Sequence, residues 1–409
     1  MAQTTPILSL PDELIAEVAA VDTPLEWTLS HVCRRFRNAV VGTPALWTTV
    51  PVDLTHEGAV QISQLYFDRS ASLGLSVTLK TEYKVAESLA HFVPHIPRVV
   101  RLTVVYGSYY ALETLLESFR DVSAPCLQHL QLENNCEQWT YPSPIDLSPL
   151  QASPITSLKL RRCSPRSPLP RWKSALTHLG MTRGAYLEDL DGDVFLGISK
   201  ELPSLTHFYF RMAEGMYSLE SGIASESLTN LHLEFDAYSN DAQVLVDILA
   251  PFRTPHLTHL SIHGIHEYQI SALFTSKNTD WSLPALTSLA FTNAEQVCSP
   301  EIDEHCKTAM ASWQIFPVLS ALTFVNQCGT AQIISRVLGS DLRSSLRTVV
   351  LWPLDEDVED VGAVLREVGE SLAPVFRVSP ALFECGQWQS SIRLKRLEAT
   401  IELHDGLCA

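Results

Sequence analysis

The densest group of possible metal ligands in the chain consists of four histidines, His256, His259, His263 and His266. If this stretch forms a strand, His259 and His263 lie on one face of it, opposite the apolar Leu260. Two imidazoles could ligate zinc, but no cysteine lies near them in the sequence and a third ligand is not evident. We therefore interpret these histidines as polar residues on the face of a sheet and predict no metal site.

The sequence lacks the motifs by which common enzymes are recognised. It contains no G-x-S-x-G, no Gly-rich phosphate loop and no H-E-x-x-H, because His266 and Glu267 are followed by Ile270 where a second histidine should stand. Residues 189–193 resemble a calcium loop, but the glycine is misplaced and no glutamate falls at the twelfth position. We therefore expect a non-catalytic protein without a cofactor.

A basic stretch stands out between residues 157 and 173, which contain no acidic residue. Its cations are Lys159, Arg161, Arg162, Arg166, Arg171 and Lys173. Three prolines in its second half exclude a helix there and predict an extended, polyproline-like turn. Guanidinium groups on a stiff backbone suit carboxylate or phosphate oxygens, so we predict that Lys159, Arg161 and Arg162, together with Arg211, bind an acidic or phosphorylated substrate segment.

Two alternatives to this interpretation of the basic stretch stay open. The cations could form a solvated loop that only balances neighbouring acids. Ser164 and Ser167 each precede a proline, and phosphorylation there would cancel the positive charge.

Composition bounds the class of protein. The chain has 409 residues, of which 46% are hydrophobic and 18% charged, so extensive disorder is excluded. A formal charge of −17 argues against nucleic acids and anionic membranes as partners. The sequence lacks a signal peptide, an apolar run long enough to span a membrane, and any N-x-S/T glycosylation site, and its nine cysteines form no C-x-x-C pair. We therefore expect a cytoplasmic or nuclear protein with free thiols.

A short phrase, L-x-x-L-x-L, recurs along most of the chain. Its central apolar positions are Leu102, Leu130, Leu158, Leu179, Phe208, Leu231, Leu260, Leu289, Leu322 and Val349. These lie 21 to 33 residues apart, which is nearly the period of leucine-rich repeats with one strand each. The Asn or Cys that usually follows occurs only at Asn135 and Cys163, so the repeats are degenerate.

Helical patterns alternate with these predicted strands. They cover residues 60–67, 112–119, 244–249, 333–338 and 358–372, and a first strand is predicted at 75–79. The fold class is therefore α/β, with a curved leucine-rich-repeat-like αβ solenoid built on a parallel sheet. We assign residues 6–50 to an N-terminal helical module, 51–95 to a linker helix and first strand, and 96–404 to the solenoid.

The N-terminal module carries more apolar surface than it can cover. Pro11 and the acids after it indicate a helix start, and Leu14 and Val18 continue an apolar stripe. A second amphipathic helix is predicted over residues 25–40, followed by the apolar Leu46 and Trp47. The stripe either folds back on the repeats or binds the helices of a partner.

Three blocks of this module resemble an F-box, in the order of that family and at nearly its spacing: residues 10–15, 29–37 and 43–47. The best match is to fungal, mushroom-type F-box proteins. The resemblance implies the substrate-recognition subunit of an SCF-type E3 ubiquitin ligase, a monomer within a complex that contains a Skp-type adaptor and, through it, a cullin. The positions that match the adaptor-facing patch and its underlying packing are Leu10, Pro11, Leu14, Ile15, Val18, Leu29, Val32, Phe36, Leu46 and Trp47.

From this resemblance we predict that Leu14→Asp or Trp47→Ala abolishes adaptor binding and leaves the repeats folded. The alternative is a non-catalytic leucine-rich-repeat scaffold whose N-terminal helices only cap the solenoid.

The repeats would hold the substrate, a protein that the sequence does not identify. The concave face of the predicted sheet carries His129, His178, His207, Tyr209, His232 and His259 in its centre, and Ala290, Ala321, Val325, Val350 and Trp352 towards its end. We expect His207, Tyr209 and His259, together with Trp352, to contact substrate, with the aromatic rings as anchors. The alternative is an unoccupied sheet floor.

Overall fold

The computed structural model divides the chain into two compact units, residues 1–175 and 176–409, and each unit is described by itself. The residues that it describes are 10–21, 25–56, 58–82, 90–120, 122–136, 144–166, 169–182, 202–212, 224–235, 244–250, 252–265, 270, 283–292, 316–325, 345–352, 361, 363, 375–378 and 394–396. Both units are α/β, and every pair of neighbouring strands described within them is parallel.

The first unit begins with a helical segment, residues 10–47. It consists of the helices α1 (Asp12–Val21), α2 (Leu25–Val32) and α3 (Arg34–Val41) and the 3-10 helix η2 (Pro44–Trp47). The prediction of one helix over residues 25–40 was wrong, because Cys33 has extended backbone (φ −158°, ψ 171°) and separates α2 from α3. The Arg37 guanidinium donates to the Ser30 carbonyl oxygen at 2.9 Å and so bridges this break.

Polar contacts fix the arrangement of these helices. The Arg35 guanidinium on α3 donates to the Leu10 carbonyl oxygen and forms an ion pair of 3.0 Å with Asp12, the first residue of α1. On the inner side of α3, Phe36, Ala39 and Val40 are buried. The segment is therefore held by both an apolar centre and a charged clamp across its surface.

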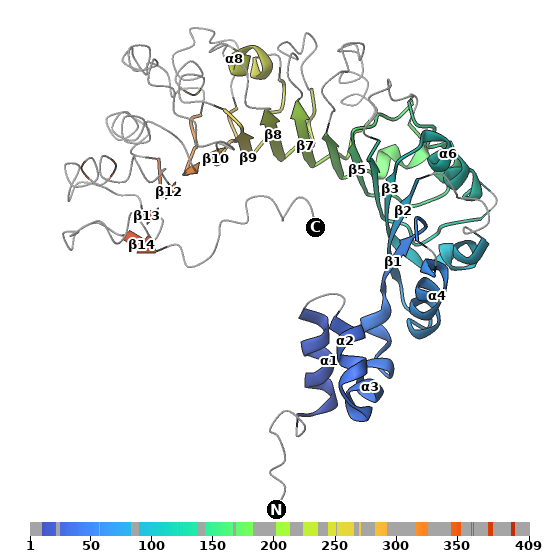
Figure 1. The fold of residues 1–409 in the computed structure, drawn as a ribbon. Coiled ribbons are helices and arrows are strands. Elements are labelled where there is room, and N and C mark those ends of the chain that lie inside the picture. The colour runs from blue at the N-terminus through green and yellow to red at the C-terminus, as the bar shows by residue number, and fades with distance from the viewer. Residues whose placement is uncertain are drawn as a thin grey trace, which may run out of the picture. The chain divides into compact units, whose positions relative to one another are not determined.

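A parallel sheet with strands in chain order follows the helical segment (Figure 1). Its strands in the first unit are β1 (Thr49–Asp53), β2 (Leu75–Thr81), β3 (Val99–Tyr106), β4 (His129–Asn134) and β5 (Ser157–Arg161). The connections contain α4 (Ala59–Arg69), η3 (Val93–Arg98), α6 (Tyr109–Ser118), η4 (Ser148–Leu150) and η5 (Arg171–Ala175). Thus α4, α6 and β2 confirm the predicted elements, whereas β1 was not predicted.

Burial alternates along the strands, as expected for a sheet with one covered face. Leu102, Leu130 and Leu158 are aligned across three neighbouring strands and are buried. The residues between them, such as Gln131 and Lys159, are half-buried on the opposite face. We call this second side the open face of the sheet.

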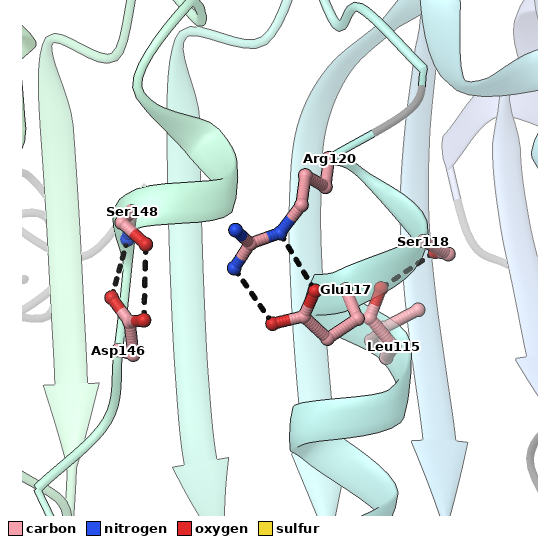
Figure 2. Close-up of polar contacts among 6 residues, drawn as sticks. All are labelled: Leu115, Glu117, Ser118, Arg120, Asp146 and Ser148. Carbon is pink, nitrogen blue, oxygen red and sulfur yellow. Dashed lines mark hydrogen bonds and ion pairs between the residues drawn. The ribbon is translucent and has the colours of Figure 1, made fainter.

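Short polar contacts order the connections beyond α6 (Figure 2). Arg120 binds both carboxylate oxygens of Glu117, at 2.7 and 2.9 Å. Asp146 accepts from the backbone N–H of Ser148 at 2.8 Å and from its hydroxyl at 3.0 Å. The hydrogen bond from the Ser148 N–H is the main reason that the pKa of Asp146 is lowered, and it closes a turn over residues 146–148 at the start of η4.

The second unit continues the same pattern. Its strands are β6 (His178–Thr182), β7 (His207–Met212), β8 (Asn230–Phe235), β9 (His259–His263), β10 (Ser288–Thr292), β11 (Ala321–Val325), β12 (Thr348–Trp352), β13 (Val375–Val378) and β14 (Leu394–Arg396). The predicted helix at 244–249 is confirmed as α8 (Val244–Leu249). The helices predicted at 333–338 and, apart from two single positions, 358–372 lie outside the described residues.

A ladder of hydroxyl groups runs across the beginning of these strands. The Thr206 hydroxyl donates to the Thr177 carbonyl oxygen at 3.1 Å, and Thr229, Thr258, Thr287 and Ser320 repeat the contact on successive strands at 3.0–3.1 Å. Each of these carbonyl oxygens also accepts two backbone N–H groups of the next strand. The ladder therefore helps to fix the register at which β7 to β11 start.

The cysteines that the structure describes are free thiols: Cys33, Cys126, Cys136 and Cys163. Cys163 is buried, burial raises its pKa to about 12, and its thiol lies 3.5 Å from the Leu132 carbonyl oxygen on the preceding repeat. Its role is thus structural. None of the helices in the described ranges is both long and apolar enough to cross a membrane.

Candidate functional site

The helical segment exposes part of its apolar stripe. Leu14, Val18 and Val32 have exposed fractions of 42%, 48% and 59%. Leu14 and Val18 are four residues apart and therefore share one face of α1. Among the other residues predicted for the adaptor patch, Pro11 is exposed, Leu10, Leu29 and Leu46 are half-buried, and Ile15, Phe36 and Trp47 are buried.

Trp47 belongs to the packing of the first unit and not to its surface. Its indole N–H donates to the Val40 carbonyl oxygen at 2.9 Å, and its ring lies edge-on to Tyr66 with centroids 5.1 Å apart. The Arg69 guanidinium lies 4.3 Å from the centroid of the same ring. Because α4 contributes both Tyr66 and Arg69, the prediction that Trp47→Ala leaves the repeats folded does not suit this position.

Exposed aliphatic side chains on a fixed scaffold are suited to binding protein surfaces. The Asp12–Arg35 ion pair and the buried Ile15 hold α1 in place, so Leu14 and Val18 are presented without further ordering of the backbone. Such an arrangement can bury apolar area against another helix.

The basic stretch in the first unit is only partly available for an anion. Lys159 and Arg161 lie on the open face of β5, and Arg162 at its end is exposed with a φ of +54°. Arg161 forms an ion pair with Glu133 at 3.4 Å, at the same register position on β4. An anionic ligand would therefore have to compete with Glu133 for this guanidinium.

The turn after β5 agrees with its prolines in the described residues. It is not helical from residue 162 to 166 or at 169–170, and η5 begins only at Arg171. Ser164 is buried and its backbone pairs with Ile145, whose N–H donates to the Ser164 carbonyl oxygen at 2.8 Å. Phosphorylation of Ser164 would therefore require this turn to open, whereas Ser167 lies outside the described residues.

The open face of the second unit brings together several predicted contacts. His178 and His259 are exposed, and His207, Tyr209 and Arg211 are half-buried. The rings of His178 and His207 are stacked with centroids 4.2 Å apart. The remaining predicted contact, Trp352, is half-buried on β12.

Two residues expected on this face are buried. His232 has an exposed fraction of 2% because the Tyr209 ring stacks on it, with centroids 4.9 Å apart. Ala290 is buried as well, with an exposed fraction of 7%. Both expectations of exposure were wrong.

Arg211 and Tyr209 converge on one acid. Glu234, which faces Arg211 across the β7–β8 pair, lies 3.3 Å from its guanidinium and accepts from the Tyr209 hydroxyl. Like Arg161, Arg211 therefore already has a carboxylate partner.

The imidazoles of this face are oriented by the hydroxyl ladder. Nδ1 of His207 lies 2.9 Å from the Thr206 hydroxyl oxygen, and Nδ1 of His259 lies 2.8 Å from that of Thr258. Burial lowers the pKa of His207, and the charges of His178 and His259 lower it further; burial also lowers the pKa of His178.

The histidine group considered as a metal site does not converge on one point. His256 lies 3.9 Å from a carboxylate oxygen of Glu226, His259 and His263 stand at opposite ends of β9, and His266 lies outside the described residues. Across the described ranges, no three side chains of His, Cys, Asp or Glu are placed to share an ion.

Sequence reasoning did not identify the threonines, Asn230, or the acids Glu133 and Glu234 as parts of these surfaces. A signal for the ladder does exist, because Leu-Thr recurs at the start of successive phrases. The acids gave no local signal, since their partners lie on neighbouring strands.

No family model matches the chain, and no curated protein matches it. Two surfaces of the described residues are candidates for binding: exposed aliphatic residues on the helical segment, and polar and aromatic residues on the open face of the sheet.

Proposed function

We propose that this chain is the substrate-recognition subunit of an SCF-type E3 ubiquitin ligase. Its helical segment binds a Skp-type adaptor, and its parallel sheet holds a protein substrate. The observation that carries the proposal is the exposure of Leu14, Val18 and Val32 on a segment whose helices are otherwise packed and clamped. The sequence blocks that resemble an F-box fall on this same segment.

Burial of these side chains favours the contact. Full burial of a completely exposed aliphatic side chain contributes about 1.5–3 kcal/mol. Leu14, Val18 and Val32 are about half exposed, so each contributes part of that amount towards the cost of association. Ile15 and Phe36 are buried, so they belong to the packing of the segment and not to its contact surface.

Under this proposal the chain performs no covalent step. The adaptor connects it to a cullin, and the sheet presents the substrate to the ligase. The two proposed functions use different surfaces, so a change to an exposed residue of one should leave the other intact.

Adaptor binding can be tested by co-purification with a Skp-type adaptor, using the full chain with Leu14→Asp. A charge introduced into a desolvated apolar contact costs far more than on a free surface, so we expect co-purification to be lost. Leu73→Asp is the matched control, because Leu73 is the same residue type, has the same exposed fraction of 42%, and lies in the turn after α4.

Both variants should melt at the wild-type temperature, because neither changes a buried side chain. Retention of the adaptor by Leu14→Asp at wild-type yield would reject the proposal. In that case the helical segment would serve as a cap for the repeats.

A further inference from the structure

Three imidazoles occupy one row on the open face of the second unit. His178 pairs in register with His207, His207 with Asn230, and Asn230 with His259. The row therefore crosses four consecutive strands at the same height, with one amide between the second and third imidazole. The stacked rings of His178 and His207 form its most closely packed part.

The ladder places a threonine hydroxyl beside Nδ1 of two of these imidazoles. The hydroxyl oxygens of Thr206 and Thr258 lie 3.1 and 3.0 Å from carbonyl oxygens of the preceding strands, and 2.9 and 2.8 Å from Nδ1 of His207 and His259. Where the hydroxyl donates to the carbonyl oxygen, it accepts from the imidazole, and Nδ1 carries the hydrogen. Asn230 shows the same arrangement, because its amide donates to the Thr229 hydroxyl oxygen at 2.9 Å.

In this tautomer of His207, Nε2 is the nitrogen that can take up a proton. In the neutral ring Nε2 has a lone pair, and after protonation it becomes a charged donor that suits carboxylate and phosphate oxygens. The hydrogen bond through Nδ1 holds the ring orientation in both states.

The other charged groups of these strands do not neutralise the row. Arg211 and Glu234 form an ion pair on the same face, four residues further along β7 and β8, and the Tyr209 hydroxyl donates to Glu234. His263 lies at the same register position on β9. His232 is buried beneath Tyr209. At the register position of the row, strands β8 and β10 carry the uncharged residues Asn230 and Ser288. Protonation of two stacked imidazoles is thus unfavourable until an anion is added.

We propose that His178, His207 and His259 bind the carboxylate or phosphate groups of an acidic substrate segment, and that His178 and His207 take up protons as they do so. This proposal rests on the proposed function, because it names the chemical class of the substrate. An extended acidic peptide lying across the strands would place successive anionic groups over successive imidazoles. Binding and protonation are then linked: whatever favours one favours the other.

Calorimetry on the full chain provides the test, with a short oligoglutamate peptide and inorganic phosphate as separate probes. We expect about tenfold tighter binding at about pH 6 than at about pH 8, with protons taken up from the buffer. Binding of oligoglutamate assigns the site to unmodified acidic segments, and binding of phosphate alone assigns it to phosphorylated ones. Failure of both probes to bind overturns the proposal.

The asparagine that lies within the row, Asn230, suggests two variants that change the number of imidazoles. His207→Asn copies the residue that already fills this position on β8, so it keeps a donor to the threonine hydroxyl and removes the titrating nitrogen. It should weaken binding at the lower pH by about tenfold and remove part of the proton uptake. Asn230→His completes the row and should strengthen binding at the lower pH.

His256→Asn is the control, because His256 is exposed in the same unit and lies outside the row. Equal binding by wild type, His207→Asn and Asn230→His would overturn the proposal. None of these measurements involves the adaptor, so a negative result here combined with adaptor binding through Leu14 would leave the proposed function standing.

Discussion

The ring of Trp47 lies edge-on to the ring of Tyr66, with centroids 5.1 Å apart and an interplanar angle of 67°. This contact joins η2, the end of the helical segment, to α4, the first helix that packs on the sheet. Arg69 covers the outer side of the same indole. The helical segment and the start of the sheet therefore share one apolar centre and should lose their structure together.

Trp47→Ala should lower the stability of the first unit by about 3–5 kcal/mol, the usual cost of removing a large buried ring. Trp47→Phe keeps most of the apolar contact and loses the indole N–H bond to Val40, so we expect a smaller loss of about 1 kcal/mol from that bond. Urea denaturation followed by circular dichroism measures both. Wild-type stability in Trp47→Ala would show that the helical segment is independent of the sheet.

The positions of most strands could be predicted from the sequence, because each of these strands contains its own L-x-x-L-x-L-like phrase. Leu130, Leu158 and Leu260 mark strands correctly, and apolar spacing identified α4 and α6. The break at Cys33 was not accessible, because the apolar positions Leu29, Val32 and Phe36 continue with helical spacing across it. Tertiary packing overrode a valid local pattern there.

β1 was not predicted, and it contains Pro51, although a proline within a run argues against a strand. The structure resolves this conflict. Ser76 N–H donates to the Thr48 carbonyl oxygen and Leu54 N–H donates to the Lys80 carbonyl oxygen, so even-numbered residues pair with β2. The nitrogen of the odd-numbered Pro51 therefore points away from β2, so the pairing of β1 with β2 does not require an N–H group at this residue.

The binding surfaces were predictable in part for a related reason. Alternation placed His207 and Tyr209 on the correct face, but it could not show that Tyr209 covers His232 or that Glu234 engages Arg211. These contacts join residues more than twenty positions apart and depend on strand register. Register is not contained in the pattern of a single repeat.

Thr229 gives a direct test of the hydroxyl ladder. Its hydroxyl donates to the Thr206 carbonyl oxygen at 3.1 Å and accepts from Asn230 at 2.9 Å. Thr229→Val has nearly the same shape and loses both bonds, so we expect a loss of about 1–3 kcal/mol in unfolding free energy. Thr229→Ser keeps the hydroxyl and should stay closer to wild type. Equal stability of the two variants, measured by urea denaturation, would show that the ladder contributes nothing.

Gly264, directly after β9, is a position where the fold requires glycine. Its φ is +75°, its N–H donates to the Thr292 carbonyl oxygen at 2.8 Å, and a Cβ added to it would overlap the carbonyl oxygen of Phe235 on the neighbouring strand. Gly264→Ala should therefore lose about 1–2 kcal/mol from the left-handed backbone. The displacement of Phe235 should cost about 1–3 kcal/mol more.

Gly107 is the matched control for this change. It follows β3, its N–H donates to the Thr81 carbonyl oxygen at 2.8 Å, and an added Cβ would lie 3.5 Å from the nearest atom, in Glu82. Gly107→Ala should be neutral or stabilise by up to about 1 kcal/mol, because alanine restricts the unfolded chain. Calorimetric melting of both variants decides the matter: if Gly264→Ala melts no lower than Gly107→Ala, the backbone of β8 yields freely and the close approach of these two strand ends does not constrain the fold.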